Sequence, residues 1–235
     1  MEVLLELIPV KLRRAVEVLE KASPKVAGLD IPESPVGVPA PNSVAMGAAV
    51  KALLPEAKVF SHIRVVDVNE VALLSLIKAA KAVGIDGVVL TRGDPPALGR
   101  AVGRLSTEEA LDLVRSRVRR PVELGAVLSM RYDEARIVER MRRGFNFFLV
   151  LRLSEDSMEK YLRIAEAAEV YGVKLYPYVI VESERNRALL ESLGQPSVRR
   201  RDVDRFIDEL RGVAAGVIVS CPGDHECLEE LAMSI

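Results

Sequence analysis

The sequence predicts a single-domain (β/α)8 barrel, the TIM-barrel fold, over residues 1–235. Eight short β-branched or apolar runs alternate with helical patterns along the chain. A length of 235 residues is ordinary for an α/β barrel of one domain. Tryptophan is absent and aromatic residues make up only 4% of the chain, so the core must consist of Val, Leu, Ile and Ala. Such a core favours parallel strands that are covered by helices.

The expected elements follow one another without an internal repeat or a linker. We expect strands at residues 3–8, 26–29, 59–66, 87–90, 122–128, 146–151, 173–181 and 216–220. We expect helices at residues 11–21, 42–54, 67–84, from 106 or 107 onward, 133–143, 155–171, 184–211 and 225–233. Capping-box spacings, Asp67 with Glu70 and Ser106 with Glu109, mark two of the helix starts. The segment Gly194-Gln195-Pro196 could break the helix at 184–211.

A carboxylate lies among apolar residues in the first strand. Period-two alternation places Leu4, Glu6 and Ile8 on one strand face, which looks into the barrel in the expected fold. Burying an unpaired carboxylate costs several kcal/mol or raises its pKa, so it is retained for chemistry or because a cation pairs with it. Arg64 is the candidate cation, and the residues alone leave both interpretations open.

Strand three and the loop after strand four carry further polar residues. His62 and Arg64 alternate with apolar neighbours and therefore point the same way. A lone histidine in a strand is more often a structural residue than a ligand. The loop reads T-R-G-D-P-P, in which Gly93 permits positive φ or a close backbone approach. Pro95 restricts Asp94 to an extended conformation, so we expect this loop to hold a charge in place.

These motifs resemble those of the methylenetetrahydrofolate reductase family. The segment E-L-I-P-V-K at residues 6–11 is similar to the family's E-F-F-P-P-K, and H-I-R at residues 62–64 to its H-L-T-C. The G-I pair at residues 84–85 and L-T-R-G-D-P-P at residues 90–96 follow in the family's order, where L-R-G-D-x-P stands. The segment G-F-N-F-F at residues 144–148 is similar to the family's strand-six entry, G-A-x-F.

The resemblance implies an oxidoreductase acting on CH–NH donors, in the one-carbon metabolism that supplies methionine biosynthesis. NADH or NADPH would reduce FAD, or FMN, and the flavin would pass a hydride to the bridging methylene of a tetrahydrofolate-type pterin. Glu6 would be the general acid that opens the pterin's five-membered ring, and Asp94 would hold the pterin and tune the flavin. The positions that match the family's cofactor contacts are His62, Thr91, Arg92, Gly93, Asp94 and Arg140.

Other functions remain open from the sequence. A reductase of this kind could take hydride from a nicotinamide without flavin, and a pterin-binding barrel of methyltransferase type could use the same acid. A third alternative is a non-catalytic subunit of a reductase complex, which needs a partner chain. A homo-oligomer is equally compatible with the sequence.

Composition argues against several classes of partner. The net charge of −1 argues against a nucleic-acid surface, and no stretch of about 20 apolar residues could span a membrane. The N-terminus does not have the pattern of a signal peptide, so we expect a cytoplasmic protein. Abundant arginine and a single glutamine are typical of a thermophilic source.

One further cluster lies near the C-terminus, in C-P-G-D-H-E-C at residues 221–227. Cys221, His225 and Cys227 could bind zinc or the two cysteines could form a disulfide, but the spacing matches no usual zinc site. We therefore expect no metal and favour a plain strand-to-helix turn, near the customary phosphate seat of such barrels.

Overall fold

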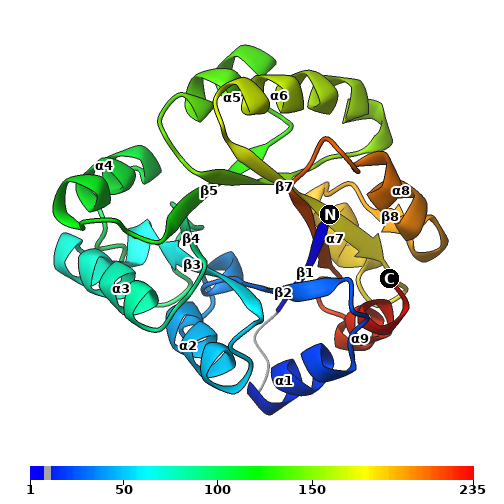
Figure 1. The fold of residues 1–235 in the computed structure, drawn as a ribbon, viewed down its shortest axis with the longest axis horizontal. Coiled ribbons are helices and arrows are strands. Elements are labelled where there is room, and N and C mark those ends of the chain that lie inside the picture. The colour runs from blue at the N-terminus through cyan, green and yellow to red at the C-terminus, as the bar shows by residue number, and fades with distance from the viewer. Residues whose placement is uncertain (8–11) are drawn as a thin grey trace.

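The computed structural model, which describes residues 1–7 and 12–235, confirms the (β/α)8 barrel (Figure 1). Eight parallel strands close in the order β6-β5-β4-β3-β2-β1-β9-β7, and β7 pairs with β6. These strands are β1 (Glu2–Glu6), β2 (Val26–Ile31), β3 (Lys58–Arg64), β4 (Gly87–Thr91), β5 (Glu123–Ser129), β6 (Phe147–Leu151), β7 (Lys174–Glu182) and β9 (Gly216–Ser220). A two-residue strand, β8 (Val198–Arg199), adds to the edge of β7.

Helices cover the outside of the barrel, as Figure 1 shows. They are α1 (Leu12–Lys21), α2 (Ser43–Leu53), α3 (Glu70–Ala82), α4 (Thr107–Arg117), α5 (Glu134–Met141), α6 (Met158–Val170), α7 (Arg187–Leu193), α8 (Val203–Glu209) and α9 (His225–Ser234). Among the described residues, no helix has the length and apolar character needed to cross a membrane.

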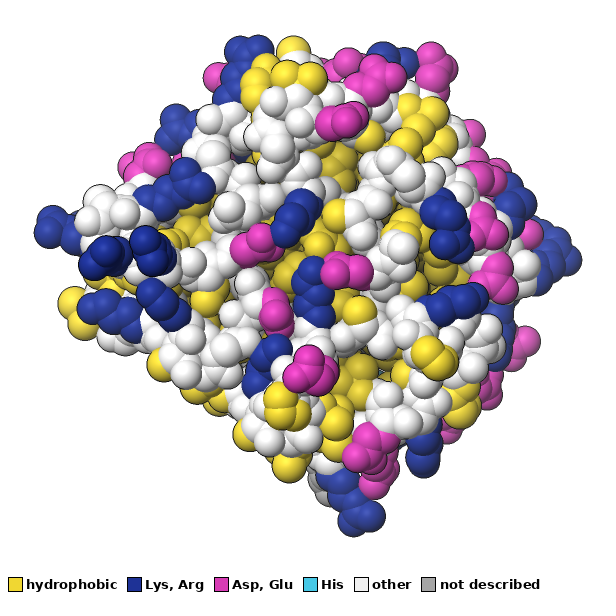
Figure 2. Space-filling model, in the orientation of Figure 1, with side chains coloured by type: hydrophobic (Ala, Val, Ile, Leu, Met, Phe, Trp, Pro, Cys, Tyr) yellow, Lys and Arg dark blue, Asp and Glu magenta, His cyan; other side chains and the backbone are white. Residues whose placement is uncertain are grey.

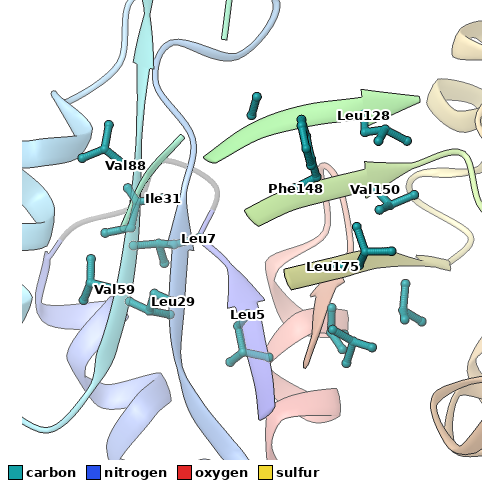
Figure 3. Close-up of a cluster of buried hydrophobic side chains, with 14 of the residues drawn as sticks. Leu5, Leu7, Leu29, Ile31, Val59, Val88, Leu128, Phe148, Val150 and Leu175 are labelled. Atoms are coloured by element: carbon teal, nitrogen blue, oxygen red, sulfur yellow. The ribbon is translucent and has the colours of Figure 1, made fainter. Parts of the chain in front are cut away.

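The larger hydrophobic core lies between the strands and the surrounding helices. Side chains on the outer face of the strands, such as Leu5, Leu29, Phe148 and Leu175, pack there (Figure 3). These positions alternate with inward-facing ones, as the strand period requires. The alternation explains why the apolar runs of the sequence predicted the strands well.

A second core fills the inside of the barrel. Phe60 stacks on Phe147 at a centroid distance of 4.5 Å, and Tyr176 meets both rings edge-on. Gly125 makes room for this layer, because a Cβ at that position would lie 2.3 Å from the Phe147 ring. Phe60, Phe147 and Tyr176 thus fill the inside of the barrel with one aromatic layer.

The end of the barrel where the strands begin carries paired charges. Lys58 Nζ lies 2.6 Å from Glu2 and 3.0 Å from the Tyr176 hydroxyl, and Lys174 lies 2.6 Å from Glu123. Basic and acidic side chains meet over the middle of this face in Figure 2. A cavity of about 830 Å³ opens here, but barrel enzymes place their chemistry at the opposite end.

Some predicted boundaries need correction, and one possible helix break is confirmed. Asn69, not Asp67, caps α3, because its side chain accepts from the Ala72 amide at 2.9 Å. The possible break at Gly194-Gln195-Pro196 is confirmed, since Gly194 takes φ 54° and ends α7, and α8 follows as a separate helix. Strand β2 extends to Ile31, two residues beyond its predicted end. The predicted end of strand one and start of helix one fall on residues 8–11, outside the described residues.

Candidate active site

Glu6 ends β1 at the carboxyl end of the barrel, where its carboxylate accepts a hydrogen bond from the Ser220 hydroxyl of β9. Burial, and after it the charge of the nearby Asp30 carboxylate, raise the pKa of Glu6 from 4.5 to about 7. The Ser220 hydroxyl and His62 offset part of this rise. A carboxyl group with this pKa can hold and deliver a proton near neutral pH.

Asp30, His62 and Tyr178 form a buried hydrogen-bonded group beside Glu6. Asp30 and Glu6 are register neighbours on adjacent strands. His62 Nε2 lies 2.8 Å from Asp30 Oδ1, and the Tyr178 hydroxyl donates to Asp30 Oδ2 at 2.7 Å. Burial alone would lower the pKa of His62, but the charge and hydrogen bond of Asp30 raise it overall. Burial, reinforced by Asp30, raises the pKa of Tyr178 well above its usual value.

The sequence left open whether Arg64 pairs with Glu6, and in the structure it pairs with Asp67 instead. Its guanidinium lies 2.6 Å from Asp67, and it donates to the carbonyls of Ser34 at 3.0 Å and Asp94 at 2.6 Å. Only 3% of the Arg64 side chain is exposed. Arg64 therefore fixes two loops, those that follow β2 and β4, over the carboxyl end of the barrel.

The loop after β4 holds the predicted cofactor-binding positions. Thr91 ends β4 and is partly buried, whereas Arg92 and Asp94 are exposed. Gly93 takes φ 82°, as its position in the motif predicted, and a Cβ there would meet the Arg64 side chain at 3.0 Å. The side chain of Asp94 thus lies at the same end of the barrel as Glu6 but outside the Glu6 network.

Arg140 lies on α5 and lines a cavity of about 560 Å³ between α4 and α5. Arg92 and Arg136 line the same cavity, and the Arg136 guanidinium lies 4.1 Å from the centroid of the Tyr132 ring. Arg140 is itself held by Glu108, at 2.7 Å, and by the Val127 carbonyl. The cavity brings Arg92 and Arg140 together from distant parts of the sequence.

The cysteine cluster contains a disulfide between Cys221 and Cys227, whose Cα atoms are 6.2 Å apart. The plain turn favoured by the sequence is therefore wrong, although Asp224 caps α9 as expected by accepting from the Cys227 amide. No group of three metal-ligating side chains occurs among residues 1–7 and 12–235. The disulfide starts one residue after Ser220, so it fixes the loop next to Glu6.

Sequence reasoning missed three members of this site: Asp30, Tyr178 and Ser220. Asp30 lies one residue beyond the strand predicted at residues 26–29, although the run V-A-G-L-D-I alternates in the same way as the first strand. Tyr178 and Ser220 lie at the ends of later strands, where polar residues in apolar runs were the available signal. Ser220 donates to Glu6 itself, whereas His62 and Tyr178 hold the neighbouring Asp30, so residues of four other strands surround an acid with a raised pKa.

Comparisons with known proteins define the fold class of the chain. No protein-family model and no curated protein matches its sequence. Among solved structures, it is similar to the EDTA monooxygenase from Chelativorans sp. BNC1, with a TM-score of 0.66 and 12% sequence identity. The alignment covers 99% of this chain and 91% of that one. At this identity the comparison establishes a shared barrel fold, and the resemblance to methylenetetrahydrofolate reductases remains a prediction.

Proposed function

We propose that the protein is a reductase of a methylene-bearing tetrahydropterin, of the methylenetetrahydrofolate reductase type, with Glu6 as its general acid. The observation that carries the proposal is the carboxyl group of Glu6, whose pKa is raised to about 7 at the carboxyl end of a barrel. Opening the substrate's five-membered ring requires a proton at a pterin nitrogen, and a carboxyl group protonated near neutral pH can supply it. The structural neighbour, a monooxygenase, agrees only at the level of the oxidoreductase class.

Each residue beside Glu6 has a specific role in the proposed reaction. Asp30 keeps the pKa of Glu6 high by its charge, and Ser220 orients the Glu6 carboxyl group through its hydroxyl. His62 and Tyr178 hold Asp30 from two sides, so the negative charge stays fixed. Because His62 and Tyr178 are buried beside Asp30, we assign them first to the support of Glu6.

A flavin nucleotide suits the residues at the carboxyl end. The cavity between α4 and α5 presents the guanidinium groups of Arg92, Arg136 and Arg140, which are the chemistry that binds phosphates. Arg92 of the T-R-G-D loop lines this cavity, and Arg64 holds the Asp94 carbonyl of the same loop, so Asp94 would orient the ring systems. When bound, reduced flavin supplies the hydride. NADH or NADPH would be the reductant, and FMN could replace FAD.

The test separates the proton step from the electron step. Glu6→Gln preserves shape and removes the proton donor, so it should abolish reduction of the methylene-pterin while nicotinamide-driven flavin reduction continues. Glu182→Gln is a matched control, because Glu182 ends β7 and pairs with Arg187 outside the Glu6 network. An equal loss of both half-reactions in Glu6→Gln would contradict the proposal.

The alternatives predict different flavin behaviour. A flavoenzyme should be yellow, or should become active and absorb near 450 nm when FAD or FMN is added, since that absorbance belongs to the flavin itself. Methylene reduction by NADH or NADPH without any flavin would instead establish a flavin-independent reductase. Absence of flavin binding and of activity would favour a subunit that needs a partner chain.

A further inference from the structure

Two arginines at the carboxyl end of the barrel share one hydrogen-bond acceptor. Arg131 lies two residues after β5, and Arg152 directly follows β6. Arg131 donates to the Gly194 carbonyl at 3.3 Å, and Arg152 donates to the same oxygen at 2.6 Å. Arg152 also donates to the Leu193 carbonyl at 3.2 Å. The two positive groups are therefore neighbours.

Neither guanidinium forms an ion pair with a described residue, that is, with residues 1–7 or 12–235. This distinguishes them from Arg64 and Arg140, which have Asp67 and Glu108 as partners. The carbonyls at the end of α7 supply only partial negative charge. Burial, and then the charge of Arg131, lower the pKa of Arg152 from its usual value. The two guanidinium groups therefore repel each other.

The backbone at Arg152 has an unfavourable conformation for this residue type. Arg152 takes φ 66°, in the left-handed region that glycine occupies without steric cost. Strain of this kind persists mainly where it positions a functional group. Here it coincides with the guanidinium group that lies next to Arg131 at the mouth of the barrel.

We propose that Arg131 and Arg152 bind an anionic group, a carboxylate or phosphate, of the ligand that enters the carboxyl end of the barrel. Two guanidinium groups offer planar, paired donors that match carboxylate and phosphate oxygens, and an anion would remove their mutual repulsion. The inference deepens the proposed function. It rests on that function only where it assigns the anion to a substrate or to a cofactor. A tetrahydrofolate-type substrate carries an acidic glutamate tail, and a nucleotide cofactor carries phosphates.

Direct binding of simple anions tests this site without flavin or turnover. The probes are γ-linked triglutamate, ADP and inorganic phosphate, titrated by calorimetry at constant ionic strength so that general screening stays fixed. Arg131→Gln and Arg152→Gln should each weaken binding by about tenfold or more, the loss expected for a charge-assisted contact. Arg163→Gln removes the same charge on α6, where Arg163 pairs with Glu134, and should leave binding unchanged.

Preference among the probes identifies the source of the anion. Stronger binding of triglutamate would assign the site to a carboxylate tail, and stronger binding of ADP or phosphate would assign it to a phosphate group. No binding to the wild-type protein, or equal binding by Arg152→Gln and Arg163→Gln, would overturn the inference. Because no turnover is measured, these results can be read even if the reductase assay fails.

A glycine variant separates anion binding from a purely structural part in capping α7. Arg152→Gly relieves the left-handed backbone strain and removes the guanidinium group. We expect it to lose anion binding about as strongly as Arg152→Gln, with a melting temperature no lower than that of the wild type. A lower melting temperature with unchanged anion binding would show that Arg152 only caps the helix, and would overturn the inference.

Discussion

Replacing Glu6 by glutamine should change how the stability of the barrel depends on pH. The pKa of Glu6 is raised in the folded state, so the folded protein binds this proton more tightly than the unfolded chain does. The corresponding stability is fully present below the ordinary value of 4.5 and is lost as the pH rises through about 7. Glutamine carries no such proton, so the variant should escape this loss.

The size of the effect follows from the size of the pKa rise. A rise from 4.5 to about 7 corresponds to about 3 kcal/mol. Part of the Glu6 side chain reaches solvent, so we expect a smaller effect. Between about pH 5 and about pH 8.5, the unfolding free energy of the wild type should fall by about 2 kcal/mol relative to that of Glu6→Gln. Burial lowers the pKa of His62 and Asp30 raises it overall, but this histidine is present in both proteins.

Urea unfolding of both proteins at the two pH values measures this difference. The unfolding free energy of Glu6→Gln should increase relative to that of the wild type as the pH rises. Glu169→Gln removes an exposed carboxylate of α6 and controls for the change in net charge. If the difference between Glu6→Gln and the wild type is the same at both pH values, then Glu6 has no raised pKa and the proposed acid is refuted.

Three further substitutions test other parts of the site. Asp30→Asn removes a charge that raises the pKa of Glu6, so the pH–rate profile of pterin reduction should shift to lower pH; an unmoved profile would contradict this. In Arg64→Lys, one ammonium group cannot bind the carbonyls of both loops, so the free energy of unfolding in urea should fall by about 2 kcal/mol. An unchanged value would show that Arg64 does not hold the two loops. Cys221→Ser should lower the free energy of unfolding by about 2 kcal/mol, because the disulfide to Cys227 closes a short loop. Reduction of the wild type should have the same effect. Equal stability with and without reductant would show that the disulfide does not stabilise the fold.

The parts of the fold that depend on local pattern were predictable from the sequence. Alternation of apolar residues located the barrel strands, and the Ser106–Glu109 capping box starts α4 as expected. Where two local signals compete, the prediction failed. Asp67 and Asn69 both precede α3, and the Asp67 carboxylate is bound to Arg64, so Asn69 supplies the cap.

Sequence patterns identified two members of the candidate site, Glu6 and His62. The inward face of strand one identified Glu6, because one residue in an apolar run is a local signal. The partner that changes the pKa of Glu6 is Asp30, and Asp30 is held by Tyr178, which lies 148 residues away in the chain. Contacts across a closed barrel depend on the register of all intervening strands, which local patterns do not encode.

The aromatic layer of Phe60, Phe147 and Tyr176 divides the interior into two compartments. These three side chains are almost fully buried and closely packed, so the layer separates Glu6 from the opposite end of the barrel. The paired charges of the other compartment, including Glu2 and Lys58, therefore lie apart from Glu6. An affinity tag, a surface linkage or a fused domain could therefore be attached at that end, close to the chain's N-terminus, without disturbing proton supply to the site.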